Sequence, residues 1–475
     1  MSWVEKGKEF VRPHLWNARG WSSKEKLLVI QSDDWGADRN AHPEGLEALR
    51  ALGVRVDACH YMLYDGLALD EDLEGLFGVM EEFRDRDGNP PVMTANVLMA
   101  NPDFERIRTG GAEYGGAKRG GVEQGGAEHG GVEQAGAEHG GFQEYHSMGL
   151  EETFERKRRE RDGYRQGLSL WREGMDAGVF FPQLHGMEHV QVPRWMRLLQ
   201  DGAGSSAIGK VFRTAFDAGI YGVSRSTLEG IAGKNSQIKP KSVQAALEVD
   251  TAEDKALVLD RISQAPAEYR RVFGYPSASF IAPNYTWFPE VESMLVQEGV
   301  RFMQGATMQW IVGGGSGSSG SGSGGSGSNG PGSGDSGNAG FGIQVERRFM
   351  GERYASGLIG QIRNVHFEPT EWWHQHARKN STGPIGSYPI SSYPVDSDSV
   401  KRALHQIRTA FLWRMPAVVS THRVNYSGVM DPALRDWNLA QLRTLLEHIL
   451  YLWPDVKFVT AEELGNRMMG HIQHG

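Results

Sequence analysis

Cysteine is almost absent from this sequence of 475 residues, in which Cys59 is the only one. A lone thiol cannot form an intrachain disulfide, so the disulfide-rich secreted scaffolds are excluded. Long apolar runs are missing too, since no stretch approaches the ~20 residues that span a bilayer. The first 21 residues are mixed polar and aromatic and lack the apolar centre of a signal peptide. We therefore expect a soluble, cytoplasmic protein with no membrane span.

Positive charge is also in short supply, because 50 lysines and arginines face 59 aspartates and glutamates and leave a net charge of −9. No long basic run is present, and phosphate binding needs clustered lysine and arginine, so we expect no nucleic-acid partner. The composition, 39% hydrophobic and 23% charged, is that of an ordinary globular protein. The chain is long enough to bury a large core.

Glycine is plentiful but is concentrated in two segments. Residues 110–141 repeat a five-residue unit of the type Gly-Gly-Ala/Val-Glu-X, residues 313–340 are almost entirely glycine and serine, and together they hold 27 of the 62 glycines. Neither segment has enough apolar residues to offset the entropy of ordering it. Because long surface loops cost little stability, we predict two disordered inserts in a single domain over residues 1–475, with a core at about 26–466.

Outside the inserts, segments with strand-like and helix-like patterns alternate. Apolar runs predict strands at Lys26–Ser32, Pro91–Leu98, Val179–Leu184, Ser279–Ala282, Val300–Gln304, Gln361–Phe367, Ala417–Ser420 and Val456–Thr460. Helical spacing is found at Glu44–Leu52, Glu71–Phe83, Glu151–Met175, Thr251–Val272, Phe288–Glu298, Ser399–Trp413 and Leu434–Tyr451. Such alternation predicts an α/β fold with a mainly parallel sheet.

Two adjacent carboxylates, Asp33 and Asp34, end the first predicted strand. In parallel α/β folds, functional groups gather where strands end, and two neighbouring carboxylates cannot both be buried without partners. One of them could bind a metal ion while the other acts as a base. The simpler alternative is a helix cap beside a surface charge.

Two histidines spaced by four residues, His185 and His189, follow another predicted strand. With an aspartate from a different strand they would form a two-histidine, one-carboxylate site that suits Zn²⁺, Fe²⁺ or Co²⁺. The segment also fits His-X-X-Glu-His, a pattern of zinc proteases that requires a helix. A strand-like run precedes His185, so we predict a loop that leads to a helix near Pro193. Two structural histidines are the remaining alternative.

Two further strands end in polar residues. The first runs into Pro283, Asn284 and Tyr285, a turn that can aim a backbone N–H into a cleft. The second ends at His422, whose imidazole suits proton transfer because its unperturbed pKa is ~6.5. A plain turn and a structural histidine explain each segment alone equally well. The joint occurrence of four such segments at strand ends favours a functional site.

Taken in order, the four segments resemble the motifs of the polysaccharide deacetylase family (NodB-homology domain, carbohydrate esterase family 4). The resemblance covers about residues 26–466 and is nearer to an uncharacterised branch than to chitin or peptidoglycan deacetylases. It implies a distorted, incomplete (β/α) barrel. It also implies a metal-dependent hydrolase that removes an acetyl or similar acyl group from an N-acetylated or O-acetylated carbohydrate.

The resemblance implies a role for each motif residue. Asp34, His185 and His189 would hold a divalent metal, expected to be zinc, with cobalt, iron, nickel or manganese as alternatives. Asp33 would be the catalytic base and His422 the general acid.

The same resemblance implies residues that contact the substrate. The Tyr285 backbone N–H would help to hold the oxyanion, with Asn284 and Pro283 in the same wall of the groove. Trp35 would stack on a sugar ring, although a buried core aromatic is the alternative.

The third motif departs from the family pattern, since Ala282 stands where the family has the arginine that orients the base. Arg363 is the expected substitute. We find no Asp-X-X-Asp-Trp fourth motif. The altered third motif keeps open a catalytically weak or inactive barrel that binds a carbohydrate or another ligand, and the His-X-X-Glu-His match keeps open a zinc protease.

Overall fold

The computed structural model describes residues 14–39, 43–110, 142–201, 206–229, 241–312, 343–380 and 397–472, together with Val11 and Ile231. Almost all of the first predicted insert (residues 111–141) and all of the second (313–340) lie outside these ranges. Their predicted disorder therefore stays a prediction.

A nine-stranded sheet forms the centre of the molecule, and every pairing within it is parallel. The spatial order is β11-β8-β6-β5-β2-β1-β13-β12, with β14 paired to β1. The strands are β1 (Lys26–Trp35), β2 (Met93–Leu98), β5 (Phe180–Gly186), β6 (Ser279–Ile281), β8 (Phe302–Gly305), β11 (Ile359–Ile362), β12 (Val365–His366), β13 (Ala417–His422) and β14 (Val456–Phe458). The predicted α/β fold with a mainly parallel sheet is confirmed.

The two ends of this sheet are consecutive in the chain. β11 pairs with β8 at one end and β12 pairs with β13 at the other, and only Arg363 and Asn364 separate them. The Arg363 N–H donates to the Gly305 carbonyl at 2.8 Å, and the Asn364 N–H donates to the Val418 carbonyl at 3.2 Å. One short segment therefore draws both ends of the sheet together, which gives a partial barrel. We call residues 363–364 the seam.

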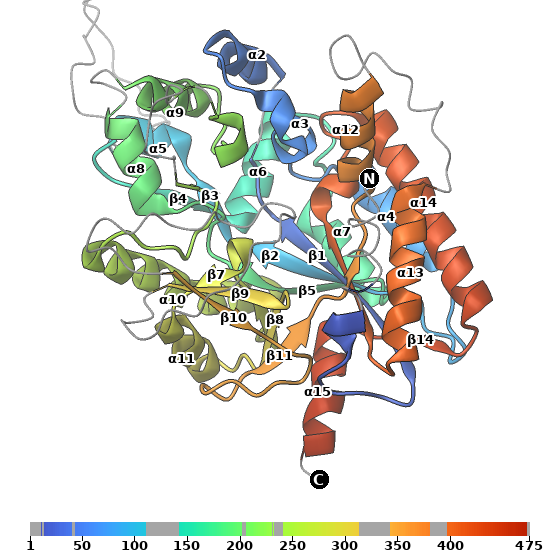
Figure 1. Ribbon diagram of the computed structural model, residues 1–475. Coiled ribbons are helices and arrows are strands. Elements are labelled where there is room, and N and C mark those ends of the chain that lie inside the picture. Colours follow the sequence, from blue (N-terminus) through green and yellow to red (C-terminus); the bar gives the residue numbers. More distant parts are fainter. Residues whose placement is uncertain are drawn as a thin grey trace, which may run out of the picture.

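Helices surround the sheet (Figure 1), with α10 and α11 on one side and α13 and α14 on the other. They are α4 (Asp70–Glu81), α6 (Leu150–Glu160), α7 (Leu168–Asp176), α10 (Ala252–Phe273), α11 (Pro289–Gln297), α12 (Pro369–Asn380), α13 (Asp398–Leu412), α14 (Pro432–Leu452) and α15 (Ala461–Ile472). Side-chain caps fix where the long ones begin. The Thr251 hydroxyl accepts from the Asp254 N–H at the start of α10, and the Asp431 carboxylate accepts from the Leu434 N–H at the start of α14.

One predicted helix, Glu151–Met175, is two helices in the structure. Residues 161–167 separate α6 from α7, and Gly163 (φ +99°) and Gly167 (φ +52°) in this stretch have left-handed backbone conformations. The helix α6 ends with the C-cap residue Arg161, whose backbone is extended (φ −149°, ψ 140°), and the two left-handed glycines that follow prevent the helix from resuming before α7. The charged helical spacing on either side concealed the break from sequence reasoning.

A second apolar cluster lies beside the main core and includes Trp195, Phe212 and Phe216. It involves α2 (Pro43–Ala51), α3 (His60–Tyr64), α8 (Val192–Asp201) and α9 (Ala207–Asp217). The predicted helix near Pro193 is confirmed as α8. Two small sheets were not predicted: β3 (Ala100–Pro102) with β4 (Ser147–Gly149), and β7 (Thr286–Trp287) with β9 (Met308–Val312) and β10 (Ile343–Arg347). Their strands are too short or too close to the inserts for a clear pattern.

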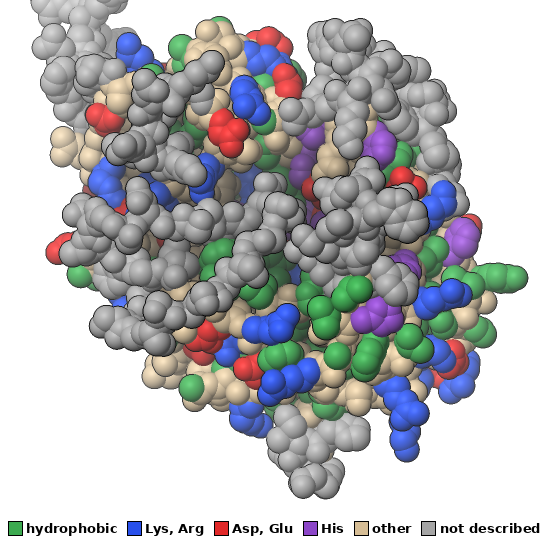
Figure 2. Space-filling model, in the orientation of Figure 1, with side chains coloured by type: hydrophobic (Ala, Val, Ile, Leu, Met, Phe, Trp, Pro, Cys, Tyr) green, Lys and Arg blue, Asp and Glu red, His purple; other side chains and the backbone are tan. Residues whose placement is uncertain are grey.

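The surface carries charges of both signs. Lys and Arg side chains alternate with Asp and Glu side chains over the described part of the face in Figure 2. Within the described ranges, no helix combines the length and the apolar character that crossing a membrane requires.

Trp35 is a core residue, so the expectation that it stacks on a sugar ring is wrong. It is 1% exposed, its indole N–H donates to the Ser32 hydroxyl at 2.9 Å, and its ring packs edge-on against Trp171 and Phe180. Strict alternation along β1 would place Trp35 on the same face as Gln31 and Asp33. The pairing of β1 with β2 shifts register between Ser32 and Trp35, and Asp34 has a positive φ, so Trp35 turns to the face of Ser32 instead. Trp35 therefore stabilises the fold and does not face a ligand.

Trp35→Ala is expected to lower the free energy of unfolding by about 3–5 kcal/mol, since it empties a packed aromatic site. Tyr451→Ala, at a side chain that is 84% exposed, is the control and should change it by less than about 0.5 kcal/mol. Urea unfolding followed by circular dichroism measures both values. Equal, small effects would contradict the core placement of Trp35.

Candidate metal centre

Three side chains from two distant parts of the sequence meet at the carboxyl ends of β1 and β5. The Asp34 Oδ1 atom lies 3.4 Å from His185 Nε2 and 3.3 Å from His189 Nε2, and all three residues are buried. β1 and β5 flank β2 in the sheet, which brings their ends to the same edge. Among the described residues, these three form the group whose ligand atoms could share one metal ion. The sequence prediction that they come together is confirmed.

The distances fit a metal ion. Ligand atoms placed 2.0–2.1 Å from zinc in a tetrahedron are separated by about 3.3 Å, which is the separation seen from Asp34 to each imidazole. The His185 Nδ1 atom is 2.9 Å from the Ile281 carbonyl oxygen, so it carries the proton and donates. This leaves a bare Nε2 lone pair that has no protein hydrogen-bond partner and faces the Asp34 carboxylate. A cation between them would relieve this contact, and the backbone bond that fixes the imidazole is typical of metal-ligating histidines.

The electrostatics around these ligands keep them in metal-binding forms. Burial lowers the pKa of His189, and the nearby Arg39 guanidinium lowers it further, so the imidazole is neutral. Burial alone would raise the pKa of Asp34, but the Arg39 guanidinium outweighs it and holds that pKa well below its usual range. A neutral imidazole and an ionised carboxylate are the forms that bind a divalent ion.

Asp33, the neighbouring carboxylate, is held by Arg363 from the seam. Arg363 donates from both terminal nitrogens to the two Asp33 oxygens at 2.6 Å, and Asn96 donates to Asp33 Oδ1 at 2.8 Å. Burial would raise the pKa of Asp33, but the guanidinium overrides it and lowers the pKa to about 2. The expectation that Arg363 substitutes for the missing third-motif arginine agrees with this contact.

The interior of the barrel is lined with amides that position Arg363. Arg363 Nε donates to Gln31 at 2.9 Å, and Asn96 and Gln304 exchange two hydrogen bonds of 2.9 Å each. Gln304 also donates to Ser279 at 2.8 Å. The residues of this network have no exposed surface and lie on six strands: Gln31, Asn96, Gln183, Ser279, Gln304 and Gln361. Such a satisfied buried network fixes side-chain positions.

His422 ends β13 directly opposite Asp33 on β1. Its Nδ1 lies 2.6 Å from the Glu368 carboxylate and its Nε2 lies 3.7 Å from Asp33. Burial would lower the pKa of His422, but Glu368 raises it to about 10, so the imidazole is protonated at neutral pH. Asn425 donates to the other Glu368 oxygen at 2.6 Å, which fixes that carboxylate. An ionised Asp33 and a protonated His422 are suited to opposite proton-transfer roles.

The third predicted segment differs from expectation in one respect. The Tyr285 N–H donates to the Ala282 carbonyl at 2.9 Å inside a 3₁₀ turn that starts at Pro283, so it is not free to bind an oxyanion. The Tyr285 hydroxyl instead accepts from Arg363 at 3.3 Å. Asn284 is exposed, and both Asn284 (φ +56°) and Tyr285 (φ +55°) have left-handed backbones.

Backbone strain is concentrated at this edge of the sheet. Asp34 also has a positive φ, at +74°, which is unfavourable for a residue with a Cβ. Left-handed non-glycine residues persist where the surroundings force them, commonly at functional sites. The strained turn at Asp34 directs its carboxylate toward the histidines, while Asp33 points toward Arg363.

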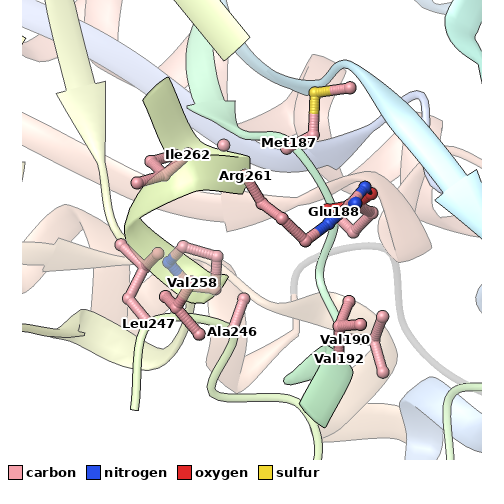
Figure 3. Close-up of a pocket in the computed structure, with 11 residues that line it drawn as sticks. Met187, Glu188, Val190, Val192, Ala246, Leu247, Val258, Arg261 and Ile262 are labelled. Carbon is pink, nitrogen blue, oxygen red and sulfur yellow. Dashed lines mark hydrogen bonds and ion pairs between the residues drawn. The ribbon is translucent and has the colours of Figure 1, made fainter. Parts of the chain in front are cut away.

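The His-X-X-Glu-His alternative is wrong in its structural requirement. His185 lies on β5 and residues 187–191 are not helical, so the two histidines do not share a helix face. Glu188 turns to Arg261, which donates to both of its oxygens, and to Tyr145 at 3.3 Å. Figure 3 shows Glu188 and Arg261 together at the wall of a small pocket that includes Leu247 and Val258. Glu188 is therefore committed to an ion pair and cannot act as the protease base.

Sequence reasoning missed three residues that contact the site: Arg39, Asn96 and Glu368. Glu368 lies two residues after the end of β12, and its position just beyond a strand end was the available signal for it. Asn96 falls within an apolar strand, where a single amide is easily taken for a solvent-facing residue. Arg39 follows Asp34 by five residues, but the sequence does not indicate that it turns inward.

No protein-family model and no curated protein matches this chain.

Arg363→Met is expected to destabilise the protein by about 3–5 kcal/mol, because it leaves the Asp33 carboxylate buried without its cation. Adding Asp33→Asn removes that charge and should recover at least about 1 kcal/mol. Arg443→Met, which breaks an exposed pair with Glu82, is the control and should cost less than about 1 kcal/mol. Denaturant unfolding of the wild-type protein, these variants and the Asp33→Asn single variant measures the coupling, and additive losses at Asp33 and Arg363 would contradict it.

Proposed function

We propose that this protein is a metal-dependent deacetylase that hydrolyses the acyl group of an acetylated carbohydrate. The observation that carries the proposal is that a candidate metal ligand and a candidate general base are adjacent residues at the end of β1. Asp34 faces two imidazoles at metal-ligand spacing, and the adjacent Asp33 faces a protonated histidine. The motif order that resembles the polysaccharide deacetylase family supports the same reaction.

A bound divalent ion, zinc being the best fit to this ligand set, would lower the pKa of a water molecule and polarise the acyl oxygen. Asp34, His185 and His189 would hold the ion. Asp33, fixed by Arg363 and Asn96, accepts the proton of the attacking water.

His422 then donates its Nε2 proton to the leaving nitrogen or oxygen of the sugar. Glu368 stabilises the imidazolium from the other side, at 2.6 Å. This carboxylate also fixes the orientation of the ring through its bond to Nδ1. Tyr285 and Asn284 lie at the rim of the site, where their side chains are available to a substrate.

Equilibrium dialysis against Zn²⁺ is expected to give about one ion per chain. His185→Ala and His189→Ala should each abolish this binding, since each removes one of three protein ligands. His448→Ala is the control, because its imidazole lies on α14 with Nδ1 2.8 Å from the Thr444 carbonyl oxygen. Equal zinc content in all four proteins would place the ion elsewhere.

Acetate release from N-acetylated and O-acetylated sugars tests the reaction. Asp33→Asn and His422→Gln should each lower kcat about 10²–10⁴-fold, the usual contribution of a general base or acid. Both variants should still bind zinc, since neither changes a ligand.

Three other outcomes of that assay are informative. Sugar binding without acetate release in the wild-type protein would favour a non-catalytic carbohydrate-binding barrel. Cleavage of peptides in place of sugars would favour a protease. Turnover that survives Asp33→Asn would remove the proposed base from the mechanism.

A further inference from the structure

A permanent positive charge sits against the proposed metal ligand. Arg39 Nη2 donates to Asp34 Oδ1 at 2.6 Å. This is the same oxygen that faces the Nε2 atoms of His185 and His189 at 3.4 and 3.3 Å. An ion held by these three ligands would therefore share its carboxylate oxygen with a guanidinium.

Arg39 is held in this position by further buried contacts. Its Nη1 donates to Asp65 Oδ2 at 3.2 Å, and the other Asp65 oxygen accepts from Arg423 at 2.7 Å. Arg39, Asp65 and Arg423 are all buried. The guanidinium therefore cannot retreat into solvent without breaking two charge-assisted hydrogen bonds.

The site is charge-balanced before a metal ion arrives. Asp33 pairs with Arg363, Asp34 with Arg39, and Asp65 with Arg423, so three buried carboxylates meet three arginines that stay charged at any physiological pH. A divalent ion normally gains from a negative ligand set. Here the one carboxylate ligand is already compensated, so the ion adds two uncompensated charges to a buried site.

We propose that Arg39 competes with the divalent ion for Asp34, so that it holds the carboxylate in place in the metal-free protein and weakens metal binding. The inference rests on the proposed function, because it takes Asp34, His185 and His189 as the ligands. Two effects of Arg39 oppose each other. Orienting a ligand raises metal affinity by about 10–100-fold. Repulsion between even two unit charges 4 Å apart amounts to about a thousandfold at an effective dielectric constant of 20.

Repulsion is the larger effect, since the ion carries two charges and only one oxygen atom separates it from the guanidinium. Asp65 offsets part of it. The net result is a preformed site that takes up its ion reversibly. Metal supply would then control how many molecules are loaded.

Zinc affinity, measured by competition with a chromophoric chelator, tests this without any activity assay. Arg39→Met and Arg39→Gln remove the charge and should tighten binding at least about tenfold. Arg39→Lys keeps the charge and should stay within about threefold of the wild-type protein. Asp65→Asn removes the carboxylate that offsets Arg39 and should weaken binding.

The outcomes separate the inference from the function on which it rests. If Arg39→Met and Arg39→Gln both bind zinc no more tightly than the wild-type protein, the inference is overturned. Arg39 would then only orient the Asp34 carboxylate and would not compete with the ion. If the wild-type protein binds no zinc, or if Asp34→Asn binds as much zinc as the wild-type protein, the proposed metal site is absent. That result contradicts the proposed function itself. Circular dichroism checks folding, and Arg39→Gln keeps a donor for Asp34 should the methionine variant not fold. Asp65→Asn tests the same competition with Arg39 unchanged, and tighter binding in it also overturns the inference.

Discussion

Two adjacent carboxylates buried at the end of β1 impose the constraint on which the rest of the site depends. Asp33 and Asp34 are both almost fully buried, and a buried carboxylate requires a cation or several donors. Each carboxylate has its own arginine: Arg363 pairs with Asp33, and Arg39 pairs with Asp34. The two ion pairs point in opposite directions from the end of β1. The left-handed turn at Asp34 separates the two side chains. One carboxylate thereby enters the barrel interior while the other faces the histidines.

The barrel interior serves the first of these carboxylates. Amide side chains from five strands and a serine from a sixth replace the apolar layers that commonly fill such barrels, and the network connects to Arg363 through Gln31 and Gln304. Arg363 itself lies at the seam, where the two ends of the sheet meet. The position of the proposed base is thus set by the closure of the sheet and by a hydrogen-bond network that leaves it little freedom.

Much of this arrangement could be predicted from the sequence. Apolar runs ending in polar residues located β1, β5, β6 and β13, and they placed Asp34, His185 and His189 together, because parallel strands bring their ends to one edge. Charge partners were harder to predict, since Arg39 and Glu368 act through contacts that no local pattern encodes. The exposure of Trp35 was predicted wrongly, because the sequence pattern of an aromatic residue at a strand end is the same whether the ring faces a ligand or the core. The role of the Tyr285 N–H was predicted wrongly, because this group donates its hydrogen bond to the Ala282 carbonyl within the turn.

The seam has a consequence for how the molecule forms. Asp33 and Arg363 lie 330 residues apart in the sequence. During synthesis on the ribosome, the carboxylate emerges first, and its guanidinium partner emerges 330 residues later. Until then the first strand carries a charge that opposes its burial. A nascent or truncated chain that stops before the seam therefore lacks the cation that neutralises Asp33, and it also lacks β13 and β14, the two later strands that pair with β1.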